Sequence, residues 1–303
     1  MAATLIAVIV ALVLGHLAQS LAASVRHFAW YGNWLRWLDA RFPEGSVWRG
    51  RYGIVLALVP PLVVVGLFQL ALQEPLLGLA GLLLGVVVLF YAWGPRDLDL
   101  DVDAIVEARD PVARRDAAAK LWPGGEGVSL DGASLVDAVF QNGLRRWFGV
   151  LFWFLLLGPF GALLYRLAAL SAEGEFARTL PAETAAGART LVAMLDWPVA
   201  QLMTLSMALV GNFDTVLGAW RDAGGTAFGL DTAFLAAAAR ASVKSELADE
   251  AMDYAESGVA TSTAVVASTP ELPELRDAMS LVWRILLLWL AVIALFVIAG
   301  WVA

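Results

Sequence analysis

The sequence predicts an all-α integral membrane protein, a bundle of four to five transmembrane helices with amphipathic or interfacial helices in two polar segments. Hydrophobic residues make up 60% of the chain and charged residues 16%, whereas soluble domains carry about 25% charged residues. Several uncharged runs reach about 20 residues, the length at which a helix crosses a hydrocarbon core about 30 Å thick. We therefore expect a single multi-pass membrane domain, residues 1–303.

Five apolar segments are candidates for the spans, near residues 5–23, 53–73, 76–93, 147–167 and 281–302. The first either spans or lies in the interface, because His16, Gln19 and Ser20 weaken the apolar character of its second half. The second is expected to kink at Pro60-Pro61, since proline removes a backbone hydrogen bond. The connection to the third is short, made by Gln73, Glu74 and Pro75 at the approximate span ends, which predicts a tight antiparallel hairpin.

The fourth segment, 147–167, contains Gly158-Pro159. It is either a kinked transmembrane helix or a re-entrant hairpin, and its uninterrupted apolar length favours the helix. In that case Arg145 and Arg146 lie at one membrane face and Arg166 lies near the other.

Three polar segments separate the spans: 24–52, 94–146 and 171–280. In the first, tryptophans are interleaved with arginines, and Ala29–Phe42 is predicted to form an amphipathic helix on the membrane. Arginine excess places 24–52 and 94–146 in the cytoplasm, so 171–280 faces out unless 147–167 is re-entrant. The stretch Trp197–Trp220 contains polar side chains, which favour a helix packed on the bundle or in the interface over a full span.

Composition also restricts the chemistry. The chain has no cysteine, only two histidines and a net charge of −8. These values exclude thiolate sites and argue against a histidine-rich metal site and against nucleic acid as a main partner. We expect no metal or cofactor, the lipid bilayer as the first partner, and a membrane or envelope protein as a further partner.

Four stretches together resemble a known family. They are Trp-Gly-Pro-Arg-Asp-Leu at 93–98, the run Val-Leu-Phe-Trp-Phe-Leu-Leu-Leu-Gly-Pro-Phe-Gly-Ala-Leu-Leu-Tyr-Arg-Leu at 150–167, Leu-Asp-Trp-Pro-Val-Ala-Gln-Leu at 195–202, and Leu-Arg-Asp-Ala-Met-Ser-Leu-Val-Trp-Arg at 275–284. The chain resembles the AmpE family of bacterial inner-membrane proteins, within the CobD/CbiB superfamily. The resemblance implies an inner-membrane regulatory or sensory protein associated with β-lactamase induction and envelope signalling in the antibiotic response. The alternative is a cobalamin-biosynthesis enzyme of the adenosylcobinamide-phosphate synthase type.

Departures from the synthase branch argue against that enzyme. Where the synthases carry carboxylates and an asparagine, this chain has Asp137, Gln141, Asn142 and Arg145. Only Asn142 matches outright, and a carboxylate has become a cation, which removes groups that hold Mg²⁺ or act as acid or base. The resemblance thus implies the shared fold without the shared chemistry, and we assign no catalytic residue.

The candidate ligand-binding or partner-binding residues are those where the resemblance meets polar positions at a membrane face: Arg96, Asp97, Asn142, Tyr165 and Arg166. The first three are expected to converge at the cytoplasmic face. Tyr165 and Arg166 join them only if Gly158-Pro159 turns the chain back. Otherwise an aromatic anchor and a snorkelling arginine explain these two residues, and we favour that account for Arg166.

Overall fold

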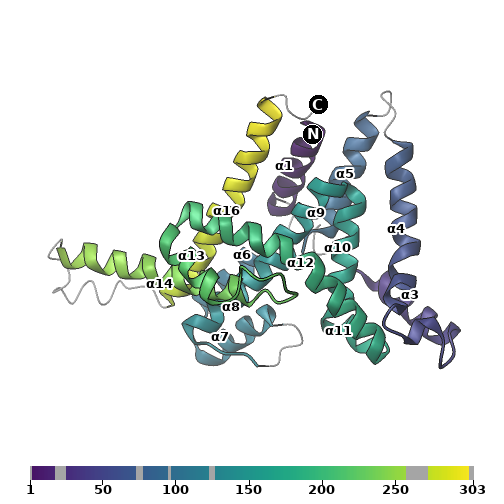
Figure 1. Cartoon of the computed structure of the whole chain (residues 1–303), viewed down its shortest axis with the longest axis horizontal. Coiled ribbons are helices and arrows are strands. Elements are labelled where there is room, and N and C mark those ends of the chain that lie inside the picture. Colours follow the sequence, from purple (N-terminus) through teal and green to yellow (C-terminus); the bar gives the residue numbers. More distant parts are fainter. Residues whose placement is uncertain are drawn as a thin grey trace. The chain divides into compact units, whose positions relative to one another are not determined.

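The computed structural model describes residues 2–17, 25–72, 78–94, 97–122, 127–256 and 272–299 (Figure 1). These residues form helices and connections without a β-strand, so the predicted all-α class is confirmed. They divide into two compact units. Unit 1 comprises 1–97, 145–199 and 290–303, and unit 2 comprises 98–144 and 200–289.

Three described helices are long and apolar enough to cross a membrane: α4 (Gly53–Ala71), α12 (Ala182–Val210) and α16 (Pro273–Ile298). Apolar helices at Thr4–Gly15 and Gly78–Ala92 are shorter. A membrane protein with at least three candidate spans is therefore supported. The candidate span in α12 was not predicted: a packed or interfacial helix was expected at Trp197–Trp220, whereas the helix begins at Ala182 and joins the apolar residues just before Trp197 to those of 197–210.

Unit 1 begins with α1 (Ala2–Leu17), which packs against α5 (Gly78–Ala92), as Figure 1 shows. In the sequence, α3 (Ala29–Arg41) comes between α1 and α5, and it confirms the helix predicted at 29–42. It packs on α4. A short 3₁₀ turn, η1 (Val47–Arg49), leads into α4.

The helix α4 continues through both prolines, Pro60 and Pro61. Neither proline has an N–H to donate, so the Ala57 carbonyl, which precedes them by three and four residues, loses its helical donors. The indole nitrogen of Trp34 donates to this oxygen at 3.0 Å. A side chain from α3 thus replaces the bond that the prolines remove, and it fastens α3 to α4.

Segment 147–167 reverses direction, so the favoured prediction of a kinked helix that crosses in one direction is wrong. A π-helical turn, η5 (Leu144–Phe148), leads into α9 (Gly149–Leu157), and α10 (Pro159–Ala172) runs back beside it (Figure 1). Gly158 has φ +69°, a region that glycine enters without strain, and Pro159 starts the next helix. At 1.5 Å per residue α9 is only about 14 Å long, less than half of a bilayer core.

A side chain from α4 holds this reversal. Gln69 donates from Nε2 to the Leu157 carbonyl at 3.1 Å, and its Oε1 accepts from the Phe160 N–H at 3.0 Å. One amide therefore satisfies the last carbonyl of α9 and an early N–H of α10, two groups that helix ends leave without helical partners.

After the hairpin, unit 1 continues with α11 (Gly174–Thr179) and the first part of α12. The first part of α12 lies against the segment that precedes α4: Thr184 Oγ1 donates to the Trp48 carbonyl, and a β-carbon at Gly187 would lie 1.8 Å from the Arg51 carbonyl oxygen.

Unit 2 contains α6 (Leu98–Glu107), α7 (Pro111–Ala118) with the 3₁₀ turn η3 (Ala119–Leu121), and α8 (Gly132–Gly143). The later part of α12, α13 (Phe213–Asp222), α14 (Ala233–Glu256) and the first part of α16 complete it. Helix α14 packs on α8 and α13, and α6 packs on α7 and α8.

Candidate functional site

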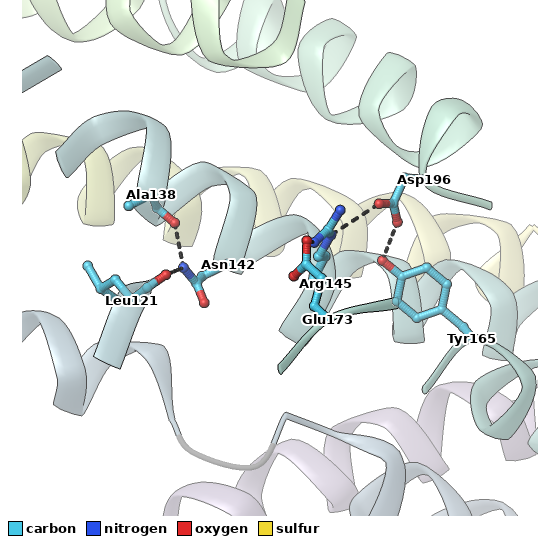
Figure 2. A network of polar contacts seen from close by, with 7 residues as sticks. All are labelled: Leu121, Ala138, Asn142, Arg145, Tyr165, Glu173 and Asp196. Atoms are coloured by element: carbon cyan, nitrogen blue, oxygen red, sulfur yellow. Dashed lines mark hydrogen bonds and ion pairs between the residues drawn. The ribbon is translucent and has the colours of Figure 1, made fainter. Parts of the chain in front are cut away.

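Four ionisable side chains form a network in unit 1 (Figure 2). Tyr165 Oη donates to Asp196 Oδ1 at 2.5 Å, and Arg145 Nε donates to Asp196 Oδ2 at 3.2 Å. Arg145 Nη1 also pairs with Glu173. Tyr165 is fully buried and Asp196 is 1% exposed, so the network is removed from water at its Asp196 end.

Local backbone features bring these side chains together. Arg145 lies in the π-helical turn before α9, and such turns are frequent at functional sites. Tyr165 approaches because residue 149 is glycine: a β-carbon there would lie 2.0 Å from the tyrosine ring. Glu173 follows the last residue of α10, and Asp196 comes from α12. The hairpin at Gly158 is what returns Tyr165 to the level of Arg145.

The network joins one guanidinium to two carboxylates. Burial lowers the pKa of Arg145, but the charges of Asp196 and Glu173 outweigh that effect and hold the pKa above its usual value. Arg145 is therefore a fixed cation. Both oxygens of Asp196 accept hydrogen bonds, as a buried carboxylate requires. The guanidinium of Arg145 compensates the buried charge of Asp196. Glu173, whose side chain is 35% exposed, connects the network to solvent.

Of the predicted site residues, Tyr165 belongs to this network. Arg166 is 3% exposed and does not snorkel, so the anchor account of it is wrong. Its Nε donates to the Ala92 carbonyl and its Nη2 to the Arg146 carbonyl at 3.3 Å. Arg26 donates to Phe90 O at 2.9 Å. The two arginines thus occupy carbonyls at the C-terminal end of α5, where a helix favours positive charge.

The remaining predicted site residues do not belong to this network. Arg96 lies outside the described residues. Asp97 is half-buried, and its charge partly offsets the lowering of the Arg26 pKa that burial causes. Asn142 lies in unit 2, where its amide nitrogen donates to the carbonyls of Leu121 and Ala138, both at 2.7 Å (Figure 2). That nitrogen therefore stabilises the end of α8 against η3.

Sequence reasoning missed Arg145, Glu173 and Asp196 as members of one site. A signal was present for the last: Asp196 is the one charged residue between Arg189 and Asp214. A lone carboxylate in an apolar run is by default a functional candidate in a membrane protein. No comparable signal marks Glu173. Among the described residues, no group of three histidine, aspartate or glutamate side chains is arranged to hold a metal ion.

Comparison with known proteins adds no family to this picture. No family model, curated protein or solved structure matches the chain.

Proposed function

We propose that this chain is a multi-pass inner-membrane protein with a regulatory or sensory role in the envelope, similar to AmpE and associated with β-lactamase induction. Three apolar helices support the membrane part of the proposal. The regulatory part rests on the resemblance and on the kind of site that the chain contains.

The observation that carries the proposal is the buried Asp196, 1% exposed, in a helix long and apolar enough to span. Burying a carboxylate is costly even when it is paired, and apolar side chains of similar volume often do as well or better for stability. A chain that keeps such a group within an apolar helix has a use for it. Arg145 is shared between Asp196 and Glu173, so a ligand or partner that draws Glu173 away changes how Arg145 holds Asp196.

The alternative is a synthase of the CobD/CbiB type. Arg145 stands at a position where the synthases carry a carboxylate, and its guanidinium pairs with two acidic side chains, Glu173 and Asp196. Asp137, another position of the synthase pattern, pairs with Arg240. Asn142, the position that matches, uses its amide nitrogen on backbone carbonyls. These contacts support a protein without the synthase chemistry.

The test is β-lactamase induction in a bacterium that carries this chain and an inducible β-lactamase. The gene is deleted and restored as wild type, Tyr165→Phe or Asp196→Asn, with Asp137→Asn as the control for loss of a carboxylate in a partly exposed ion pair of unit 2. We expect the deletion and Asp196→Asn to alter induction at normal membrane level, and Asp137→Asn to leave it unchanged. Unaltered induction in the deletion strain contradicts the proposal.

A second experiment addresses the alternative. The wild-type gene is placed in a strain that lacks the cobinamide-phosphate synthase. We expect no growth without added cobinamide. Growth would favour the enzyme over the regulatory protein.

A further inference from the structure

A groove lies between α3 and α4, away from the network just described. It is lined by Trp30, Asn33, Trp34 and Trp37 on α3 and by Pro60, Pro61 and Val64 on α4, and its volume is about 590 Å³. Its surface is almost entirely apolar. We propose that this groove binds one acyl chain of an anionic phospholipid, with the headgroup at the arginines of α3.

The walls of the groove are rigid. Trp34 and Trp37 stack with ring centroids 5.1 Å apart and planes 12° apart. Trp34 is fixed by its bond to the Ala57 carbonyl, and Trp30 donates to the Tyr91 hydroxyl at 2.6 Å. The groove therefore exists before any ligand enters, so little ordering cost opposes binding.

The position of the groove identifies a lipid as the occupant. It opens beside the exposed apolar face of α4, where Val59 is 46%, Val63 49% and Val64 54% exposed. In a helix that spans, this face meets acyl chains. Trp30 and Trp37 are themselves 41% and 53% exposed, and tryptophan is enriched where acyl chains meet headgroups.

Charge selects the headgroup. Arg36 is exposed, and its hydrogen-bond partner among the described residues is the neutral amide of Asn33, which lines the groove. Arg41 is also exposed and continues the face of Trp30, Trp34 and Trp37, since it follows Trp37 by four residues. Guanidinium groups beside an apolar groove at the interface favour a phosphate-bearing anion over a zwitterion.

The test is native mass spectrometry of the full-length chain in detergent with equal amounts of phosphatidylglycerol and phosphatidylcholine. Trp37→Ala removes a wall and Val64→Trp fills the groove. Both should lower lipid retention roughly tenfold, Trp37→Ala because the acyl chain loses an aromatic contact and Val64→Trp because its indole takes the space of the chain. Phe68→Ala is the matched control, because Phe68 is an exposed aromatic of the same helix outside the groove. Wild-type retention in both groove variants, or equal loss in the control, overturns the site.

The headgroup is tested separately. Arg36→Gln with Arg41→Gln should abolish the preference for phosphatidylglycerol, whereas Arg115→Gln with Arg178→Gln, two exposed arginines elsewhere, should keep it. An unchanged preference overturns the anionic headgroup. A wild-type chain that dimerises without lipid and becomes monomeric on Val64→Trp overturns the lipid and assigns the groove to a second copy.

A further measurement uses a variant that keeps an aromatic side chain in the wall of the groove. In bilayers with phosphatidylglycerol brominated on its acyl chains, the wild-type chain should lose more tryptophan fluorescence than the conservative variant Trp37→Phe. Equal quenching of the two proteins counts against an acyl chain in the groove.

Discussion

The hydroxyls of Tyr31 and Ser171 share a hydrogen bond of 2.7 Å, although 140 residues separate them in the chain. Tyr31 also stacks edge-on against Phe176, with ring centroids 6.0 Å apart. The beginning of segment 171–280 therefore lies beside segment 25–52. The two cannot lie on opposite sides of a membrane, as a single crossing at 147–167 would require.

This contact predicts the topology. Because the chain has no cysteine, Glu44→Cys and Arg178→Cys each introduce a single thiol at an exposed position. Both should be shielded from an impermeant reagent in intact cells, since the arginine excess of 24–52 predicts a cytoplasmic location. Glu74→Cys is the labelled control, because the connection 73–75 has no lysine or arginine and is therefore expected on the outer face. Labelling of Arg178→Cys but not Glu44→Cys would contradict the hairpin.

Gln69 should be a stability determinant although it lies near the end of an apolar helix. Gln69→Leu leaves the Leu157 carbonyl and the Phe160 N–H without their partner. Each orphaned group costs about 1–3 kcal/mol when water cannot reach it, so we expect a lower melting temperature in detergent and faster proteolysis at the hairpin. Leu67→Ala, an exposed position on the same helix, should change little. Equal melting of Gln69→Leu and wild type would show that the hairpin does not need this amide.

Much of the helical content is local in origin and could be predicted from the sequence. The helix at 29–41 follows from the spacing of its apolar side chains, since Tyr31, Leu35 and Leu38 recur every three or four residues. The start of α7 follows from Asp110 and Pro111: the aspartate side chain accepts from the N–H groups of Val112 and Ala113, and proline suits the first helical position.

What could not be predicted depends on contacts distant in sequence. Gly158-Pro159 permits both a kink and a reversal, and the choice is stabilised by Gln69, 88 residues before Leu157. Likewise Tyr165 was a candidate by resemblance, but its partner Asp196 reaches it only because α10 has turned back. Single-sequence periodicity contains no information on either pairing.

The close contact between α12 and the backbone of Arg51, just before α4, predicts a sharp difference between two helical glycines. At Gly187 a β-carbon would lie 1.8 Å from the Arg51 carbonyl oxygen, whereas at Gly218 it would meet nothing within 4 Å. Gly187→Ala should reduce the amount of folded protein in the membrane. Gly218→Ala should raise stability by about 0.5–1 kcal/mol, because alanine loses less backbone entropy in a helix. Folded yield after detergent extraction measures both, and a normal yield of Gly187→Ala would contradict the contact.

Asp131, at the N-terminus of α8, should give stability that depends on pH. Hydrogen bonds from the Ser129 hydroxyl, then from the Ser134 side chain and N–H, lower its pKa to about 2. The ordinary value in an unfolded chain is about 3.9. The stabilisation is therefore complete above that value and is lost as pH falls through about 2. The melting advantage of wild type over Asp131→Asn should narrow on acidification, and an advantage that stays constant down to about pH 2 would contradict this role of Asp131.

The buried pair of Arg145 and Asp196 permits a test of whether the network serves stability or function. Asp196→Leu removes the buried acid that pairs with Arg145, and Arg145→Met removes the guanidinium that pairs with the buried carboxylate of Asp196. Each single change should cost about 3–5 kcal/mol, because removing one partner strands the other charge. The double variant should melt closer to wild type than either single variant, since an apolar pair of similar volume avoids the cost of a stranded charge.

The double variant then separates the two roles. If the charged side chains of Arg145 and Asp196 serve regulation, the double variant is stable, reaches normal membrane level and fails to restore β-lactamase induction. If these charged side chains serve packing alone, the double variant restores induction fully, and the network is then only a structural element. Glu173→Gln is the companion variant, because its side chain is 35% exposed and its loss should leave melting nearly unchanged. Altered induction in Glu173→Gln with unaltered melting would identify the solvent-facing end of the network as the point where a ligand or partner acts.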